Sequence, residues 1–147
     1  MSDVTGTGEV IVWRLHCASP PERVYEALTT DAGRSQFWAE STRREGDELW
    51  FTFIHGEVGP CPVVEETSPS RFALVYFGHD VSFTLEPDGS GGTDLELRTS
   101  GFTEEDRDDV LAGWLNVLFP LKGYVDFGID LRNHDPERSW KQKYVDQ

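Results

Sequence analysis

The segment that most constrains the fold is a long stretch near the end of the chain, residues 103–133. Its apolar residues recur at spacings of three and four, as on one face of a helix: Leu111, Trp114, Leu118, Leu121, Val125 and Ile129. Val110, Val117 and Tyr124 widen this stripe beyond that of an ordinary surface helix. Because a flat surface cannot cover so wide a stripe, we expect a concave partner around the helix.

The ends of this helix carry local signals. Thr103 can cap its first turn, and the acidic residues 104–106 suit the positive end of the helix dipole. Pro120 lies inside the segment and lacks a backbone N–H, so a bend is expected there. The run 132–136, which ends in a proline, predicts the end of the helix near Arg132. Residues 136–147 are expected to form a polar tail.

The middle of the chain has the two-residue period of β-strands. Strands are expected at residues 9–16, 41–45, 48–54, 58–66, 71–77, 80–86 and 93–99. In the last two, one side of the strand is apolar: Val81, Phe83, Leu85, Leu95 and Leu97. The other side is polar, which indicates an antiparallel sheet with one face in water. The segment 49–54 is apolar on both sides, so the pattern leaves the orientation of Phe51 and Phe53 open.

Two short helices are expected between the first strand and the second. Ser19 is a candidate N-cap, followed by two prolines and by Glu22 at the capping-box position, which predicts a helix through Thr29. A second helix is expected at residues 32–39 and presents Phe37 and Trp38. One strand, two helices, six strands and a long helix are typical of the α+β class. We expect residues 1–147 to form one domain, with residues 1–8 unstructured.

Charge narrows the range of partners. The chain has 13 basic and 27 acidic residues, a net charge of −14. Such a chain is repelled by nucleic acid and by anionic membranes, and it suits a basic protein partner. No apolar run approaches the roughly 20 residues that span a bilayer, so membrane insertion is not expected. Two isolated cysteines and the lack of a signal-peptide pattern favour the cytoplasm.

No motif in the chain indicates a particular catalysed reaction. The four histidines are far apart and have no metal-ligand spacing, and Cys17 and Cys61 lie in no nucleophile motif. We therefore expect no metal, no cofactor and no catalytic residues. As acid–base candidates there remain His55, His79, Glu57 and Tyr76, with surface loop residues as the alternative.

Two carboxylates of the long helix need a separate interpretation. Asp126 and Asp130 lie one helical turn apart, on the same face as Lys122. They could form a paired-carboxylate site. A solvated face with a Lys122–Asp126 ion pair is the favoured interpretation, because such pairs are common on exposed helices.

Several separated segments resemble one family. They are the segment Ala18–Leu28, which reads ASPPERVYEAL, then Phe37-Trp38, Gly101-Phe102, Gly113-Trp114-Leu115 and Leu121-Lys122. In this order they resemble the START-like (SRPBCC) superfamily, which includes the birch-pollen allergen. Within it they are most similar to activators of the ATPase of the 90-kDa heat-shock chaperone. The resemblance covers nearly the whole chain and implies the helix-grip fold, a curved antiparallel sheet of six or seven strands around the C-terminal helix.

The resemblance also implies a cavity between the sheet and the last helix. Its expected lining is Trp38, Phe51, Phe53, His55, Tyr76, His79, Phe83, Leu97, Trp114, Leu118 and Leu121. The favoured function is a binding or carrier domain for a small hydrophobic molecule of the lipid, sterol or aromatic polyketide class. A chaperone-associated protein-interaction module is the first alternative. An enzyme similar to polyketide cyclases or hydrolases is the second.

Overall fold

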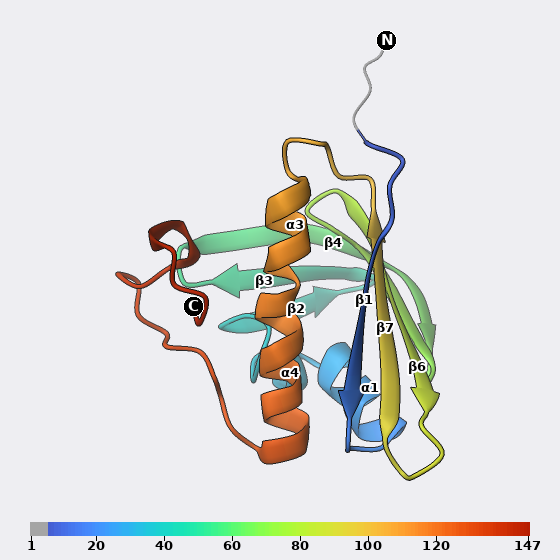
Figure 1. The fold of residues 1–147 in the computed structure, drawn as a ribbon. Helices are drawn as coiled ribbons and strands as arrows, with labels where there is room; N and C mark the ends of the chain where they lie inside the picture. The colour runs from blue at the N-terminus through green and yellow to red at the C-terminus, as the bar shows by residue number, and fades with distance from the viewer. Residues whose placement is uncertain (1–5) are drawn as a thin grey trace.

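Within residues 6–147, which the computed structural model describes, seven antiparallel strands form one curved sheet (Figure 1). The spatial order of the strands is β1-β7-β6-β5-β4-β3-β2. Their bounds are β1 Ile11–Cys17, β2 Ser41–Glu45, β3 Glu48–Phe53, β4 Gly56–Thr67, β5 Arg71–Tyr76, β6 His79–Pro87 and β7 Thr93–Ser100. The sheet wraps around the C-terminal helical segment, so the predicted α+β helix-grip architecture is confirmed.

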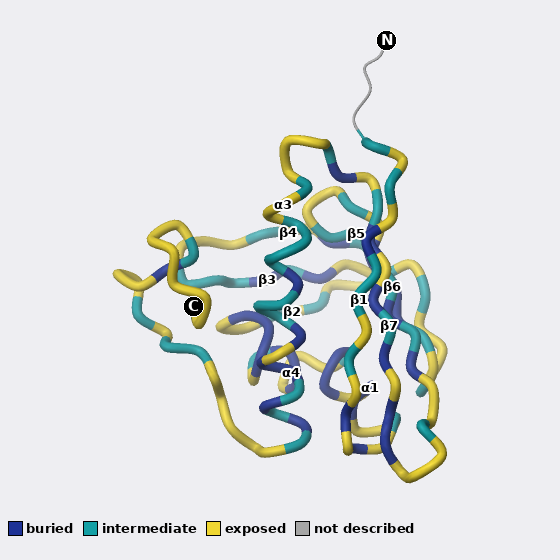
Figure 2. Tube along the Cα trace, viewed as in Figure 1, coloured by how far each residue is buried: buried dark blue, intermediate teal, exposed yellow. Residues whose placement is uncertain are grey.

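The alternation predicted for the last two strands is confirmed. The five residues of the predicted apolar face are each at most 3% exposed. Phe83 lies opposite Phe72 on β5 and opposite Leu97 on β7, so large side chains meet across three neighbouring strands. Figure 2 shows exposed residues in the hairpin turns and near the C-terminus, among other places.

Two short helices follow β1, with differences from the sequence prediction. Helix α1 is Pro21–Thr29 and its N-cap is Pro20, so Ser19 is not the cap. The Ser19 hydroxyl instead donates to the carbonyl oxygen of Val125 at 2.6 Å, a partner far along the chain. Helix α2 is only Asp31–Arg34. Trp38 lies in the turn that follows, where the backbone N–H groups of Trp38 and Ala39 both donate to the carbonyl oxygen of Arg34.

The long C-terminal helix is two consecutive helices, α3 Arg107–Gly113 and α4 Leu115–Phe127 (Figure 1). Helix α4 continues through Pro120, and the interruption between the two helices lies at Trp114, where the sequence analysis expected none. Thr103 caps a turn before α3, since its hydroxyl oxygen accepts from the N–H of Asp106 at 3.2 Å. Among the described residues, no helix is long and apolar enough to cross a membrane.

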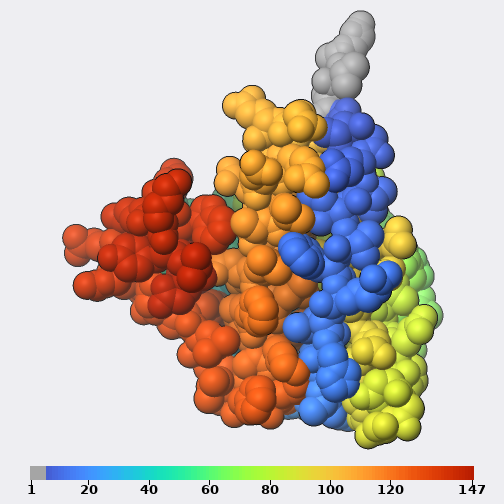
Figure 3. Space-filling model, in the orientation of Figure 1, coloured from blue at the N-terminus to red at the C-terminus, as the bar shows by residue number. Residues whose placement is uncertain are grey.

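Helix α4 ends earlier than predicted because Gly128 follows it in the left-handed conformation, with φ of 66°. A residue in this conformation cannot continue a right-handed helix, and glycine adopts it at little steric cost. Ile129 is therefore outside the helix and half exposed. Residues 129–147, here called the C-terminal segment, leave α4 and fold back beside it, as the space-filling view in Figure 3 shows.

The predicted unstructured start, residues 1–8, lies largely outside the described residues. At its described end, the backbone N–H of Thr7 donates to the carbonyl oxygen of Phe102 at 3.0 Å. This contact places the segment before β1 next to the connection between β7 and α3.

Candidate functional site

An aromatic cluster fills the space between the sheet and the junction of α3 with α4. Trp38 lies at its centre, with ring-centroid distances of 5.0 Å to Phe51, 5.5 Å to Tyr76, 5.8 Å to Phe83 and 5.9 Å to Trp114. Most pairs are tilted or edge-to-face, the arrangement that the quadrupoles of aromatic rings favour. The space between the sheet and the α3–α4 junction is thus packed with side chains, and the open space lies to one side of this cluster.

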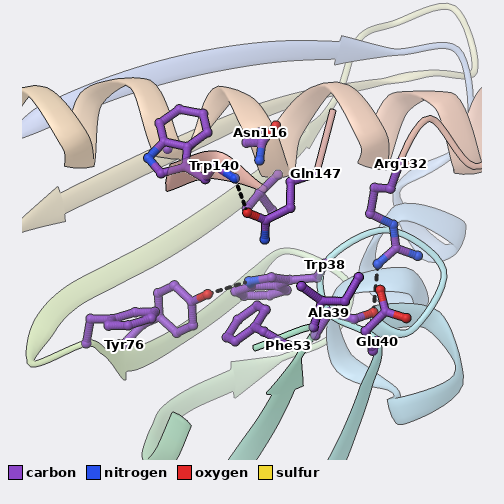
Figure 4. Close-up of a pocket in the computed structure, with 13 residues that line it drawn as sticks. Trp38, Ala39, Glu40, Phe53, Tyr76, Asn116, Arg132, Trp140 and Gln147 are labelled. Atoms are coloured by element: carbon purple, nitrogen blue, oxygen red, sulfur yellow. Dashed lines mark hydrogen bonds between the residues drawn. The ribbon is translucent and has the colours of Figure 1, made fainter. Parts of the chain in front are cut away.

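That open space consists of two adjoining pockets, here together called the aromatic cleft, with volumes of about 260 Å³ and 470 Å³. Tyr76, Phe77, Gly113, Val117 and Trp140 line both pockets. Figure 4 shows Trp38, Phe53 and Tyr76 on the sheet side, and Asn116, Trp140 and Gln147 on the opposite side. A concave space of this size with aromatic walls and few polar groups is typical of small-molecule sites.

The structure divides the residues predicted to line a cavity into three groups. Trp38, Phe53, Tyr76, His79 and Trp114 do line the aromatic cleft. A second group lies in the packed core, each at most 2% exposed: Phe51, Phe83, Leu97, Leu118 and Leu121. His55 lies apart from the cleft, where its Nε2 is 2.9 Å from the carbonyl oxygen of Pro136.

Sequence reasoning missed most of the other lining residues, and three of them are prominent in the cleft. Phe77 lies in the turn after β5, Asn116 lies between two apolar residues of α4, and Trp140 lies in the tail. An aromatic residue within a polar tail is itself a signal for Trp140, because a tryptophan without an apolar partner is unfavourable in water. No local signal marks the other two.

Burial shifts the pKa values of two titratable groups of the cleft. Burial raises the pKa of Tyr76, and a bond from Trp38 Nε1 to its hydroxyl oxygen, at 3.2 Å, opposes this only in part. Within the described part of the chain, the Tyr76 hydroxyl accepts this bond and donates none, so its proton is available to a ligand. Burial also lowers the pKa of His79, although the Asp106 carboxylate opposes the shift.

Asp126 and Asp130 do not form a paired-carboxylate site. Helix α4 ends before Asp130, whose carboxylate bonds to Arg132 and His134. The predicted Lys122–Asp126 ion pair is present at 2.9 Å. The predicted solvated face is wrong for Asp126, because its side chain is only 2% exposed and also accepts bonds from Ala18 and Ser19. Among the described residues, no group of histidine, cysteine and acidic side chains could hold a metal.

The side chains of Arg132 and His134 attach the C-terminal segment beside the cleft. Arg132 donates to the carbonyl oxygens of Ala39 at 2.7 Å and of Ser35 at 2.9 Å, and its side chain is 6% exposed. The His134 ring lies between two carboxylates, with Nδ1 2.6 Å from Glu40 and Nε2 2.7 Å from Asp130. These contacts hold the C-terminal segment in place, so that its Trp140 forms part of the wall opposite the sheet.

The attachment through His134 is expected to depend on pH. Its hydrogen bonds with Asp130 and Glu40 raise the pKa of His134 above its ordinary value of 6.5. The stabilisation is therefore complete below about pH 6.5 and is lost as pH rises through the raised value. We expect His134→Gln to lower the free energy of unfolding at about pH 6 and to lower it much less at about pH 9. Chemical unfolding across a pH series would measure this difference.

His55→Gln is the control for this prediction, because the His55 ring bonds a backbone carbonyl rather than a carboxylate. Its effect on the free energy of unfolding should vary less with pH. An equal cost of His134→Gln at all pH values would contradict the ion-pair explanation.

Comparison with known proteins identifies related proteins and folds. The family model described as "Activator of Hsp90 ATPase homolog 1-like protein" matches residues 18–126. A protein of Staphylococcus saprophyticus has a similar structure, with a TM-score of 0.73 and 20% identity over 84% of this chain and 96% of that one. The Aha1 dimer of Colwellia psychrerythraea gives a TM-score of 0.72 and 22% identity, over 82% and 98%.

A third similar structure is DynU16, a protein of the dynemicin biosynthetic locus. Its TM-score is 0.69 at 21% identity, over 82% of this chain and 48% of that one. Likenesses at this level of identity establish the fold. A comparison with curated proteins gives no match.

Proposed function

Because the chain belongs to the family of Activator of Hsp90 ATPase homolog 1-like proteins, we propose that it is a domain of this family that binds a small hydrophobic molecule in its aromatic cleft. The observation that carries the proposal is the cleft itself. Aromatic side chains line both of its adjoining pockets, and the charged residues Glu40, Asp106, Asp109 and Arg132 are also among the lining residues. The similarity to a protein of a biosynthetic locus supports a small-molecule ligand.

The physical basis of binding would be the burial of apolar surface. At roughly 25 cal/mol per Å², removing on the order of 200 Å² of ligand surface from water contributes about 5 kcal/mol. Part of this is offset by the lost freedom of the ligand and by the ordering of side chains. Affinities in the micromolar range therefore require a ligand that fills most of both pockets.

The direct test is a heteronuclear NMR titration with a panel of fatty acids, sterols, flavonoids and aromatic polyketides. We expect shifts of the backbone amides at Phe77, Gly113, Val117 and Trp140, which line both pockets. The amide of Phe127, which lines neither pocket, is the internal control. A spectrum unchanged by every compound would overturn the proposal, as would shifts confined to the outer face of α4.

A chaperone-binding role is the second candidate, favoured by the family itself and by one surface feature. Phe119, Phe127 and Ile129 leave apolar side chains exposed by 59%, 68% and 50% at α4 and just beyond it. Exposed apolar groups on an acidic domain suit a protein partner that has both apolar and basic contacts. Titration of the 90-kDa chaperone at low and high salt tests this, and a lack of binding at low salt would exclude it.

A further inference from the structure

The turn between β5 and β6 places a phenylalanine, Phe77, in a backbone conformation that bulky residues rarely adopt. Tyr76 and His79 are paired across the two strands, and the two residues between them both have positive φ, 53° at Phe77 and 76° at Gly78. This is the pattern of a two-residue hairpin turn that favours asparagine followed by glycine. A bulky residue such as phenylalanine is strained in the left-handed conformation, so the turn itself does not explain Phe77.

The protein core does not explain Phe77 either. Its side chain is 56% exposed, and its ring lies 4.7 Å from the Tyr76 ring and 6.4 Å from the Phe53 ring at the cleft. Phe77 lines both pockets. Backbone strain of this kind is retained chiefly at functional sites, and here it presents an aromatic ring to open space.

Trp140 presents a second ring to the same space from the C-terminal segment. It begins the short 3-10 helix η1, Trp140–Gln142, which a capping box between Ser139 and Gln142 holds. Ser139 is 4% exposed, so the base of this helix is buried although the segment lies at the surface. Trp140 is thereby positioned on the wall that faces Tyr76 and Trp38 (Figure 4).

The charges around the cleft disfavour an anionic ligand. Asp106 and Asp109 line one pocket and Glu40 lines the other. Arg132, the cation among the described lining residues, is already bonded to Asp130 and to two backbone carbonyls. A carboxylate ligand would therefore meet negative charge with no free cation to compensate it.

These contacts indicate the class of ligand, on the premise that the proposed binding function is correct. We propose that the cleft selects neutral, flat aromatic molecules that carry a hydrogen-bond acceptor such as a ketone. Phe77 and Trp140 contact the faces or edges of the ligand ring. The unused proton of the Tyr76 hydroxyl is donated to the acceptor.

The first test uses three probes of similar size: 2-acetylnaphthalene, 2-ethylnaphthalene and dodecanoate. The wild-type protein is expected to bind the ketone about tenfold more tightly than the hydrocarbon, and dodecanoate more weakly than both. Tyr76→Phe should remove the preference for the ketone, so that the ratio of the two naphthalene affinities falls to about one. Because the readout is a ratio within one variant, a change in stability does not imitate the result.

The second test separates ligand contact from folding. Phe77→Asn suits the turn, so the melting temperature should stay equal or rise, whereas affinity for both naphthalenes should fall several-fold. Phe127→Asn is the matched control, because Phe127 is similarly exposed at 68% and lines neither pocket of the cleft, and it should leave both affinities unchanged.

The outcomes that overturn the inference are distinct from those that overturn the proposed function. A preference for the ketone that survives Tyr76→Phe, or full affinity in Phe77→Asn, would refute the roles assigned here. Wild-type binding of fatty acids or sterols but of neither naphthalene would refute the ligand class and leave the binding function standing. No binding of any compound would refute both.

Discussion

Trp114→Ala is expected to lower the free energy of unfolding by about 3–5 kcal/mol, the usual cost of removing a large buried aromatic side chain. Trp114 is 5% exposed, and its ring lies 5.5 Å from Tyr76 and 5.9 Å from both Trp38 and Phe83. Its removal leaves a hole in the aromatic cluster that the rigid sheet cannot close. Since Trp114 also lines the cleft, ligand affinity should fall as well.

Chemical unfolding and a ligand titration measure the two effects of Trp114→Ala. Trp140→Ala is the informative comparison, because Trp140 lines the same cleft from a surface segment and is only partly buried. It should weaken binding with a much smaller loss of stability. If Trp114→Ala remains folded and binds as tightly as the wild type, Trp114 does not contact the ligand.

The second large effect is expected at Asp126, which joins the end of α4 to the start of α1. Its carboxylate accepts bonds from the backbone N–H of Ala18 at 2.9 Å, from the N–H of Ser19 at 3.0 Å and from Lys122 Nζ at 2.9 Å. Asp126→Ala leaves these donors without their partner in a nearly closed site. We expect a loss of about 3 kcal/mol in the free energy of unfolding.

The same carboxylate should make stability depend on pH in the acid range. Burial by itself would raise the pKa of Asp126, but bonds from Ala18, Lys122 and Ser19 outweigh it and lower the pKa from 3.8 to about 2. A lowered folded-state pKa contributes stability that is complete above the unfolded value and is lost as pH falls through the folded one. The difference between wild type and Asp126→Asn should therefore shrink as pH falls from about 4 to about 2.

Asp108→Asn is the control, since the Asp108 side chain is 97% exposed and its removal should cost less than about 0.5 kcal/mol. Calorimetric unfolding of wild type, Asp126→Asn and Asp108→Asn at several pH values would measure how the cost of each substitution depends on pH. If Asp126→Asn costs as little as Asp108→Asn, the hydrogen bonds of Asp126 between α4 and the β1–α1 connection contribute little to stability.

Much of the fold was predictable because its signals are local. Alternation with a period of two identified the inner faces of β6 and β7, since side-chain direction in a strand depends only on position along it. The turns at Gly46-Asp47, between β2 and β3, and at Gly89–Gly92, between β6 and β7, also consist of residues that favour turns. The end of α4 was missed although Gly128 is such a signal, because the apolar period continues beyond it to Ile129.

The sequence by itself determined the α+β class, the antiparallel strands and the presence of a wide apolar helix, because periodicity and turn chemistry act over a few residues. Only the tertiary structure decided where the open space lies and what lines it. Trp38 meets Tyr76, and Ser19 meets Asp126, across separations of 38 and 107 residues. Such contacts depend on how the sheet curls and where the C-terminal segment folds back. These are properties of the whole packed chain, and no short stretch of residues carries them.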